Sequence, residues 1–406
     1  MTVEVNEDLP SPLASSPFRG IYVHVPFCGR RCTYCDFAIA IRREVPVDEY
    51  VDAVLAELDL RLRTSAEVDL RTIYLGGGTP SKLGGPGIQR LIGEIAHRLG
   101  VGELSTFGGG RSVGAGDSST IKNLEVTIEV NPEDVSPEAA ESWARAGVNR
   151  ASVGVQSFDL GVLKWMHREH SPELAELAVK TLRAAGISEL SVDLIFAVPD
   201  TLGRSWSSDL DRVLALEADH LSVYGLTVEP QTPLGKWTAR GEVTEAPEER
   251  YEAEFLLADR RLVEAGYEHY EVSNYARPGK RARHNSSYWS GVPYLGIGPS
   301  AHSFDGVERR WNIPAYAAWL TALGERRDPV QGREVIGSKE RVAEDVYLGL
   351  RTTEGIEIRQ NELKTVTPWV RAGWGDLAGG RLVLSPTGWL RLDSIATVLT
   401  SLRSPS

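Results

Sequence analysis

Three cysteines lie close together in the segment HVPFCGRRCTYCDF, and they are the only cysteines among the 406 residues of the chain. Cys28, Cys32 and Cys35 form an odd and tightly spaced set, which does not suit a framework of disulfide bonds. Thiolates are ligands of soft metals, so the spacing predicts metal or redox chemistry on one compact loop. Three thiolates and one open position suit an iron–sulfur cube in which the fourth iron is free to bind a substrate.

A zinc ion is the alternative occupant of this loop. Structural zinc prefers four protein ligands, usually arranged as two pairs, and the sequence has no second pair of cysteines. His24 could complete a zinc site. It belongs to an alternating apolar segment, however, and is expected instead to line a cavity.

Other unusual residues follow apolar segments further along the chain. The segment YLGGGTPSKL contains three consecutive glycines, which allow a backbone to approach a ligand closely. The segments IEVNPED, GVQSFD and VDLIFAVP each join an apolar strand to a polar residue, whose burial without a partner would be costly. These residues therefore indicate a shared polar site.

The elements that position these residues alternate between strands and helices from Gly20 to about Leu226. The expected strands cover residues 21–25, 72–75, 125–130, 151–155, 190–196 and 221–226. Amphipathic spacing predicts helices between them, which indicates an α/β fold with a parallel sheet, either open or closed into a partial barrel. The C-terminal ends of the strands in a β/α barrel converge on one face. Because this would gather the unusual residues around one cavity, we favour a partial (β/α)6 barrel.

The cysteine spacing CxxxCxYC after a first strand resembles the signature of the radical S-adenosylmethionine (SAM) superfamily. The resemblance implies that the three cysteines hold a [4Fe–4S] cluster and that SAM chelates the fourth iron. One electron from the cluster would then cleave SAM to methionine and a 5′-deoxyadenosyl radical. The triple glycine is similar to the motif that binds the SAM amino group, which implies that Gly78 and Thr79 lie at the cofactor.

From about residue 20 to 300 the chain resembles the coproporphyrinogen-oxidase-like subgroup of this superfamily. This resemblance implies SAM contacts from Tyr22, Glu129, Gln156, Arg168 and Asp193. The carboxylates would bind the ribose hydroxyls or the amino group of SAM, and Arg168 would bind its carboxylate. From the residues alone, Arg168 could equally be a solvated helical arginine, and Asp193 could be a structural carboxylate that caps a turn.

Two segments depart from the pattern of the subgroup. Where the subgroup usually has LIYGLPGQT, this chain has LIFAVPDTL, so Ala197 and Asp200 replace residues that give the loop its freedom. Pro299 also stands in a stretch that is normally richer in glycine. We therefore expect the local shape of the pocket to differ from that of the subgroup.

The segment RHNSSYWSGVPYLGIGPSAHS resembles the same subgroup rather than the superfamily at large. Its aromatic residues could present a flat surface to a macrocycle, and His284 or His302 could ligate a haem iron. The alternative is that Tyr288, Trp289 and Tyr294 pack the seam between the barrel and a C-terminal domain.

Two features separate functions within the subgroup. The oxygen-independent oxidase pattern continues as CxxxCxxCxC after a longer N-terminal extension, whereas here Phe37 stands at the fourth position and 27 residues precede Cys28. Both departures match the haem chaperone subfamily, HemW, which is understood to bind haem and to deliver it to acceptor proteins. The resemblance implies haem and a haem-accepting protein as partners, with a flavodoxin or ferredoxin as electron donor. Coproporphyrinogen III oxidase and a radical enzyme on some other substrate are the alternatives.

Composition and charge limit the partners and the cellular compartment that are expected for the protein. A net charge of −12 argues against nucleic acid as the main partner. No apolar run approaches the roughly 20 residues that span a bilayer, and the acidic, Pro/Ser-rich start does not look like a signal peptide. We expect a cytoplasmic protein, with peripheral membrane contact if the haem acceptor is membrane-associated.

The same patterns divide the chain into four expected parts. These are a mobile N-terminal tail (1–19), a radical SAM barrel (20–228) with a Gly/Ser-rich surface insertion (about 105–123), an aromatic-rich extension packing on the barrel (229–304), and a smaller, mostly helical C-terminal domain (305–406). A phosphate loop is the alternative for the insertion, but the P-loop lysine pattern is missing.

The end of the C-terminal domain contains the segment RLVLSPTGWLRL, which predicts a hairpin with its turn at Pro386-Thr387. Helices followed by a hairpin can resemble a winged DNA-binding module. The acidity of the chain favours a packing domain instead.

Overall fold

The computed structural model describes residues 17–64, 68–100 and 124–404. The expected N-terminal tail, up to residue 16, and the Gly/Ser-rich insertion at 105–123 lie outside the described residues. Within the described part of the chain, every helix is too short or too polar to span a bilayer.

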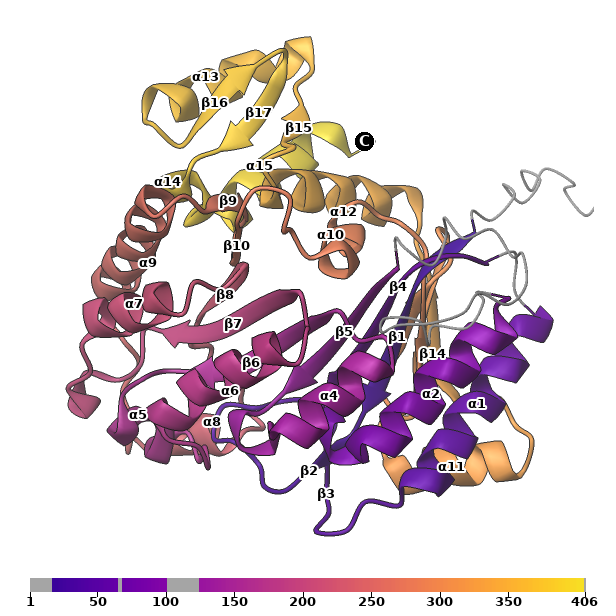
Figure 1. Ribbon diagram of the computed structural model, residues 1–406. Coiled ribbons are helices and arrows are strands. Elements are labelled where there is room, and N and C mark those ends of the chain that lie inside the picture. Colours follow the sequence, from indigo (N-terminus) through magenta and orange to yellow (C-terminus); the bar gives the residue numbers. More distant parts are fainter. Residues whose placement is uncertain (1–16, 65–67, 101–123, 405–406) are drawn as a thin grey trace, which may run out of the picture.

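A curved sheet forms the centre of the molecule, and its middle strands run parallel (Figure 1). Each strand expected from the sequence corresponds to one of these strands, and together they form the partial barrel. In spatial order they are β1 (Phe18–Val25), β4 (Val68–Gly77), β5 (Glu125–Val130), β6 (Arg150–Gln156), β7 (Glu189–Phe196) and β8 (His220–Gly225).

The alternation of side chains along β1 shows how the sheet separates its two faces. Ile21, Val23 and Val25 are fully buried in the hydrophobic core. Tyr22 lies on the other face, where its ring stacks on that of Tyr74 from β4, at 5.9 Å between centroids. Successive residues of a strand point to opposite faces, so the barrel interior receives the polar and aromatic residues.

The helices that connect the strands cover the outer face of the sheet (Figure 1). They are α1 (Val47–Thr64), α2 (Gly84–Arg98), α4 (Pro137–Arg145), α6 (Pro172–Ala184) and α7 (Trp206–Ala215). Ser136, Ser171 and Ser205 begin the last three, and each serine side chain accepts a hydrogen bond from a backbone N–H of the first turn. This capping satisfies donors that a helix N-terminus leaves without partners.

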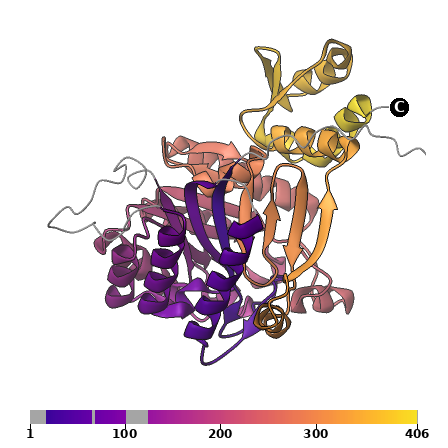
Figure 2. The ribbon, with the colours of Figure 1, turned by 90° about the vertical axis from the view of Figure 1, so that its right-hand side faces the viewer.

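Further strands extend the sheet at both edges (Figure 2). Beyond β8 lie β10 (Asn274–Ala276) and β9 (Glu268–Glu271). Beyond β1 lie β11 (Tyr294–Ile297), which is parallel to β1, and then the antiparallel strands β12 (His302–Phe304), β13 (Glu308–Asn312) and β14 (Val330–Val335). The boundary expected at residue 305 therefore passes through a continuous sheet, and we propose that the C-terminal part begins at Ser338.

A buried polar cluster fastens the added strands to the barrel. The Glu57 carboxylate, on α1, accepts hydrogen bonds from Arg61 Nη2 (3.2 Å), Gly298 N (3.0 Å), Asn312 Nδ2 (2.6 Å) and Trp319 Nε1 (2.8 Å). Trp319 belongs to α11 (Tyr316–Gly324). Burial raises the pKa of Glu57, while the Arg61 charge and the donated hydrogen bonds oppose the shift. The cluster thus joins α1, the β11–β13 edge and α11.

The C-terminal part combines helices with a small sheet and lies at the end of the barrel away from the cysteine loop (Figures 1 and 2). Its helices are α12 (Ser338–Arg351), α13 (Leu363–Arg371), α14 (Pro386–Trp389) and α15 (Leu392–Arg403). The strands β15 (Ile356–Glu357), β17 (Arg381–Leu384) and β16 (Gly375–Ala378) form the sheet in that spatial order.

The hairpin in this part does not turn where the sequence predicted. β16 and β17 are joined through Gly379 and Gly380, both of which have positive φ. Pro386 instead begins α14, with Ser385 as its N-cap. The prediction at Pro386-Thr387 was wrong because a serine followed by a proline also favours the start of a helix.

Candidate functional site

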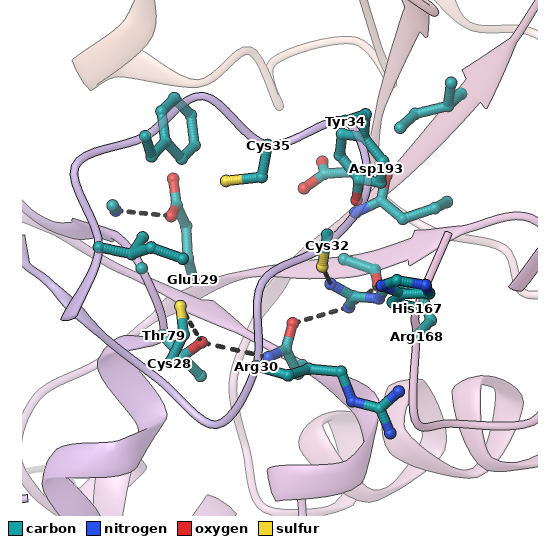
Figure 3. Close-up of a pocket in the computed structure, with 18 of the residues that line it drawn as sticks. Cys28, Arg30, Cys32, Tyr34, Cys35, Thr79, Glu129, His167, Arg168 and Asp193 are labelled. Carbon is teal, nitrogen blue, oxygen red and sulfur yellow. Dashed lines mark hydrogen bonds between the residues drawn. The ribbon is translucent and has the colours of Figure 1, made fainter. Parts of the chain in front are cut away.

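The cysteine loop leaves the C-terminal end of β1 and returns to α1. It is anchored by the pair β2 (Phe27–Cys28) and β3 (Ala40–Ile41), and Arg42 N donates a hydrogen bond to Cys28 O (3.0 Å). All three cysteines are half-buried free thiols. They border a cavity of about 430 Å³, a size typical of small-molecule sites (Figure 3).

The cavity lies at the C-terminal ends of the parallel strands. It is lined by nine of the twelve residues that the sequence singled out: Cys28, Cys32, Cys35, Gly78, Thr79, Glu129, Gln156, Arg168 and Asp193. All its lining residues fall between Cys28 and Glu229, so neither the aromatic segment 283–303 nor the C-terminal part contributes to it. The strand-end argument from the sequence expected the cysteines, Gly78, Glu129, Gln156 and Asp193 around one space, whereas Thr79 and Arg168 were expected there from the family resemblance.

A chain of polar contacts connects two of the cysteines. Thr79 Oγ1 lies 3.4 Å from Cys28 Sγ and accepts a hydrogen bond from Asn131 Nδ2 (3.3 Å). Arg168 Nη2 donates to Asn131 Oδ1 (2.7 Å), and Arg168 Nη1 donates to Cys32 Sγ (3.7 Å). The network thus places a hydroxyl group and a guanidinium group against two sulfur atoms of the loop.

Two carboxylates line the same cavity as the cysteines. Glu129 accepts hydrogen bonds from Tyr74 Oη (2.8 Å) and Gly77 N (2.9 Å), and burial raises its pKa to about 7. Asp193 accepts from Ser152 Oγ (3.0 Å), and burial raises its pKa to about 6. Both groups would be stabilised as carboxylates by a ligand that brings hydrogen-bond donors or positive charge.

Glycines allow the backbone to close around the cavity. A side chain at Gly78 would meet the carbonyl group of Pro26 at 2.8 Å, so the triple glycine can pass the cysteine loop only without a Cβ. Gln156 lines the cavity with a φ of 67°, an unusual conformation for a residue other than glycine. Such local strain is found preferentially at functional sites.

The residues present fit an iron–sulfur cluster with a polar organic ligand beside it. Free thiols border the cavity, which also contains carboxylates of raised pKa. Arg168 Nε, buried next to the cysteines, has no hydrogen-bond partner among the described residues. Burial raises the pKa of Cys28 and that of Cys35, the latter to about 11, so binding of metal would release protons from these thiols.

His24 is not available as a fourth ligand for a zinc ion. His24 Nε2 lies 3.0 Å from Ala38 O, and His24 Nδ1 lies 3.1 Å from Tyr22 Oη, so both ring nitrogens are engaged. Across residues 17–64, 68–100 and 124–404, no three His, Cys, Asp or Glu side chains are grouped as ligands of a single metal ion. Neither His24 nor Tyr22 lines the cavity; both belong to the layer of side chains beneath it.

His284 lies away from the cavity. Its Nδ1 is 2.7 Å from Thr72 Oγ1 and its Nε2 is 2.8 Å from Tyr288 Oη, and burial lowers its pKa to about 3. Trp289 of the same helix, α10 (Arg283–Trp289), stacks under the guanidinium of Arg351 at 4.2 Å. The segment thus packs the seam between the barrel and the C-terminal part, as the alternative interpretation predicted, and His284 has no free nitrogen for a haem iron.

His302 differs from His284 in being exposed. Its ring stacks on Trp311 at 6.0 Å between centroids, on the strands β12 and β13. Burial still lowers its pKa, helped by the charge of Arg309. His302 does not line the cavity, so the structure does not bring either predicted haem ligand to the cysteines.

Sequence reasoning missed several residues of the site. Asn131, Ser152 and His167 line the cavity but were not singled out as site residues. Asn131 follows Glu129 in the quoted motif IEVNPED, so the strand-end rule could have found it. No comparable signal marks His167, because an isolated histidine at the end of a short helix has no distinctive pattern.

The loop after β7 is held in place by hydrogen bonds to Glu254. Ala197 has a φ of 57°, and its backbone N–H donates a hydrogen bond to Glu254 Oε2 (2.7 Å). Glu254 also accepts from Arg204 Nη2 (2.8 Å). An alanine in this left-handed conformation is strained by roughly 1–2 kcal/mol, and the surrounding hydrogen bonds hold it there.

Comparison with known proteins identifies the family. The model of the radical SAM superfamily matches residues 22–205. The heme chaperone HemW of Mycobacterium tuberculosis (strain H37Rv) is 34% identical over 96% of this chain and 96% of its own length. The Escherichia coli heme chaperone HemW is 37% identical over 70% of each chain. Coproporphyrinogen III oxidase (HemN) from Escherichia coli shares the fold, with a TM-score of 0.76 at 21% identity over 96% of this chain and 91% of that one. This chain belongs to the HemW family of radical SAM proteins.

Proposed function

We propose that this protein is a haem chaperone that binds haem and transfers it to acceptor haem proteins. The observation that carries the proposal is similarity to heme chaperones along nearly the whole chain. Phe37 supports it, because this residue stands where the oxidase pattern has a further cysteine, and it is 55% exposed at the rim of the cavity.

Membership of the radical SAM superfamily implies a [4Fe–4S] cluster and SAM as cofactors. When bound, they supply one-electron reductive cleavage of SAM. We assign Cys28, Cys32 and Cys35 to the cluster. The proposed contacts to SAM come from the remaining lining residues of the expected set, namely Gly78, Thr79, Glu129, Gln156, Arg168 and Asp193. Tyr22 would act on SAM only indirectly, since it lies beneath the cavity.

The raised pKa values of the two carboxylates predict how SAM binding depends on pH. Glu129, with a pKa of about 7, and Asp193, with a pKa of about 6, must lose their protons to accept hydrogen bonds from ribose hydroxyls or an ammonium group. The affinity for SAM should therefore rise about twentyfold from pH 6 to pH 8, roughly tenfold through Glu129 and roughly twofold through Asp193. Glu129→Gln should bind SAM roughly tenfold more weakly at pH 8 and should flatten this profile, as measured by anaerobic equilibrium dialysis.

Without SAM, the free energy of unfolding should fall as the pH rises, whereas the affinity for SAM rises. The folded-state pKa of each carboxyl group lies above its value in the unfolded chain, so the folded protein holds more protons. The resulting stabilisation is complete below about pH 4 and is lost as pH rises through 6 and 7. Glu133→Gln is the matched control. Burial raises the pKa of Glu133, but its contact with His170 and the charge of Arg168 lower it overall, so this carboxyl group is ionised between pH 6 and 8 and the variant should keep the wild-type pH profile over that range. If the stability of the wild-type protein does not change with pH over this range, the raised pKa values of Glu129 and Asp193 are contradicted.

Two assays on anaerobically purified, cluster-containing protein test the chaperone proposal. We expect haem titration to produce a saturable Soret band, and transfer of the haem to an apo-haemoprotein to follow. In parallel, incubation with coproporphyrinogen III, SAM and a reductant should yield no protoporphyrinogen. Formation of protoporphyrinogen would instead support an oxidase, the alternative function on the same fold.

An external electron donor is part of this proposal. The rim of the cysteine loop is exposed at Arg31, Phe37, Arg42 and Arg43, which gives a partly basic and partly apolar surface near the cluster ligands. An acidic one-electron carrier such as a flavodoxin or ferredoxin fits this surface. We propose that the exchange takes place in the cytoplasm, with peripheral membrane contact where the acceptor is itself bound to a membrane.

A further inference from the structure

A histidine and two tryptophans form an aromatic surface beside the cavity. His167 lines the cavity and is exposed, and Figure 3 shows it next to Arg168 on the side of Cys32. Its ring lies 5.9 Å from that of Trp237, which lies 6.2 Å from the ring of Trp165. Trp165 ends the helix α5 (Leu160–Trp165), and Trp237 belongs to α8 (Pro233–Ala239). Both tryptophans are half-buried.

Backbone hydrogen bonds tie this aromatic surface to the cysteine loop. Thr33, which lies between Cys32 and Cys35 and is fully buried, donates from its N–H to Met166 O (3.3 Å). Thr33 O accepts a hydrogen bond from Leu234 N (2.9 Å) at the start of α8. The loop, the end of α5 and the start of α8 therefore form one connected unit.

The surroundings of the eight histidines show which of them could bind a metal-containing ligand. The ring nitrogens of His24, His170, His220, His269 and His284 contact hydrogen-bonding or charged groups of the protein. His97, His167 and His302 are exposed. Of these three, His167 lines the cavity.

The backbone at His167 is strained. Its φ is 60°, a left-handed conformation that costs a non-glycine residue roughly 1–2 kcal/mol. The conformation follows the end of α5 and leaves the imidazole exposed at the cavity. Strain of this kind persists where the surrounding structure holds it, and it often marks ligand-binding positions.

The charges nearby suit an anionic ligand with a flat ring. Lys164, on α5, and Lys236, on α8, are exposed and form no ion pair with the described residues. Each precedes one of the tryptophans in the sequence. The two helices thus carry aromatic faces for a macrocycle and ammonium groups for its carboxylates.

We propose that haem docks on the surface formed by Trp165, His167 and Trp237, with a ring nitrogen of His167 bound to the iron. This inference rests on the proposed chaperone function. It replaces the two histidines that the sequence suggested, because His284 is buried with both nitrogens engaged and His302 lies outside the cavity. Haem in this position would lie next to the cluster loop and would remain accessible to an acceptor.

The test uses full-length protein with its cluster, titrated anaerobically with haemin. His167→Gly is the principal variant, because glycine adopts the backbone conformation at this position without strain and folding is not impaired. We expect the variant to shift the Soret band, to bind haemin at least about tenfold more weakly, and to recover the wild-type band when free imidazole is added. Trp237→Leu should weaken binding without moving the band.

His302→Ala is the matched control, since it removes another exposed histidine that stacks on a tryptophan. It should leave both the band and the affinity unchanged. An unchanged spectrum and affinity in His167→Gly would overturn the inference, as would a shift caused by His302→Ala instead. If wild-type protein gives no saturable Soret band at all, the proposed chaperone function itself fails, which is a different result from failure of the His167 assignment.

Discussion

Replacement of Cys28, Cys32 or Cys35 by serine is expected to abolish the iron–sulfur cluster while the fold remains intact. In the proposed assignment the three thiolates would hold the cluster, so loss of one of them would leave it with two protein ligands. The three thiols are half-buried on a loop outside the hydrophobic core, so their removal should cost little stability. Iron and sulfide content, visible absorption and far-ultraviolet circular dichroism after anaerobic reconstitution measure the two effects.

Asp36→Asn is the matched control for these variants. Asp36 is exposed on the same loop next to Cys35, and its replacement removes a carboxylate without removing a thiol. The control should retain iron, sulfide and colour. Wild-type levels of iron and sulfide in all three cysteine variants would refute the cluster assignment and the function proposed from it.

Arg61→Met is expected to reduce the free energy of unfolding by about 3–5 kcal/mol. The variant leaves the buried Glu57 carboxylate without its cation, although the hydrogen bonds from Gly298, Asn312 and Trp319 remain. An uncompensated buried charge is strongly destabilising. Urea denaturation followed by circular dichroism, under anaerobic conditions, gives the loss.

Arg90→Met provides the comparison at the surface. Arg90 pairs with Asp48 and Asp52 of α1, but all three side chains are exposed to solvent, so this variant should lose at most about 1 kcal/mol. The double variant Glu57→Gln/Arg61→Met should regain part of the stability, because it removes both charges. Equal losses in Arg61→Met and Arg90→Met would show that the Glu57 cluster does not fasten the added strands to the barrel.

Local sequence patterns were sufficient to predict the barrel and most of the site. The six parallel strands are short β-branched segments followed by helices, and the rule that active sites lie at their C-terminal ends placed Glu129 and Asp193 beside the cysteines. Gly78 was expected at the cofactor from the resemblance of the triple glycine to a family motif, and its close approach to Pro26 shows why a side chain does not fit there.

What the sequence did not predict depends on contacts between distant segments. The pairing of β13 with β12 and of β14 with β13 leaves no local periodicity, so the sequence placed a boundary at residue 305, within this sheet. His284 sits in a motif rich in aromatic residues and looks like a ligand. Only its contacts with Thr72 and Tyr288 show that both of its nitrogens are engaged. The role proposed for His167, conversely, depends on its ring contact with Trp237, which is 70 positions further along the chain.

The placement of the C-terminal part determines from which side ligands can reach the cavity. This part caps the end of the barrel opposite the cysteines, and no residue beyond Glu229 borders the cavity within the described chain. Haem, SAM and the electron donor would therefore all approach the molecule on the face that residues 338–404 leave uncovered. Binding of one of them would then limit the space left for the other two on that face.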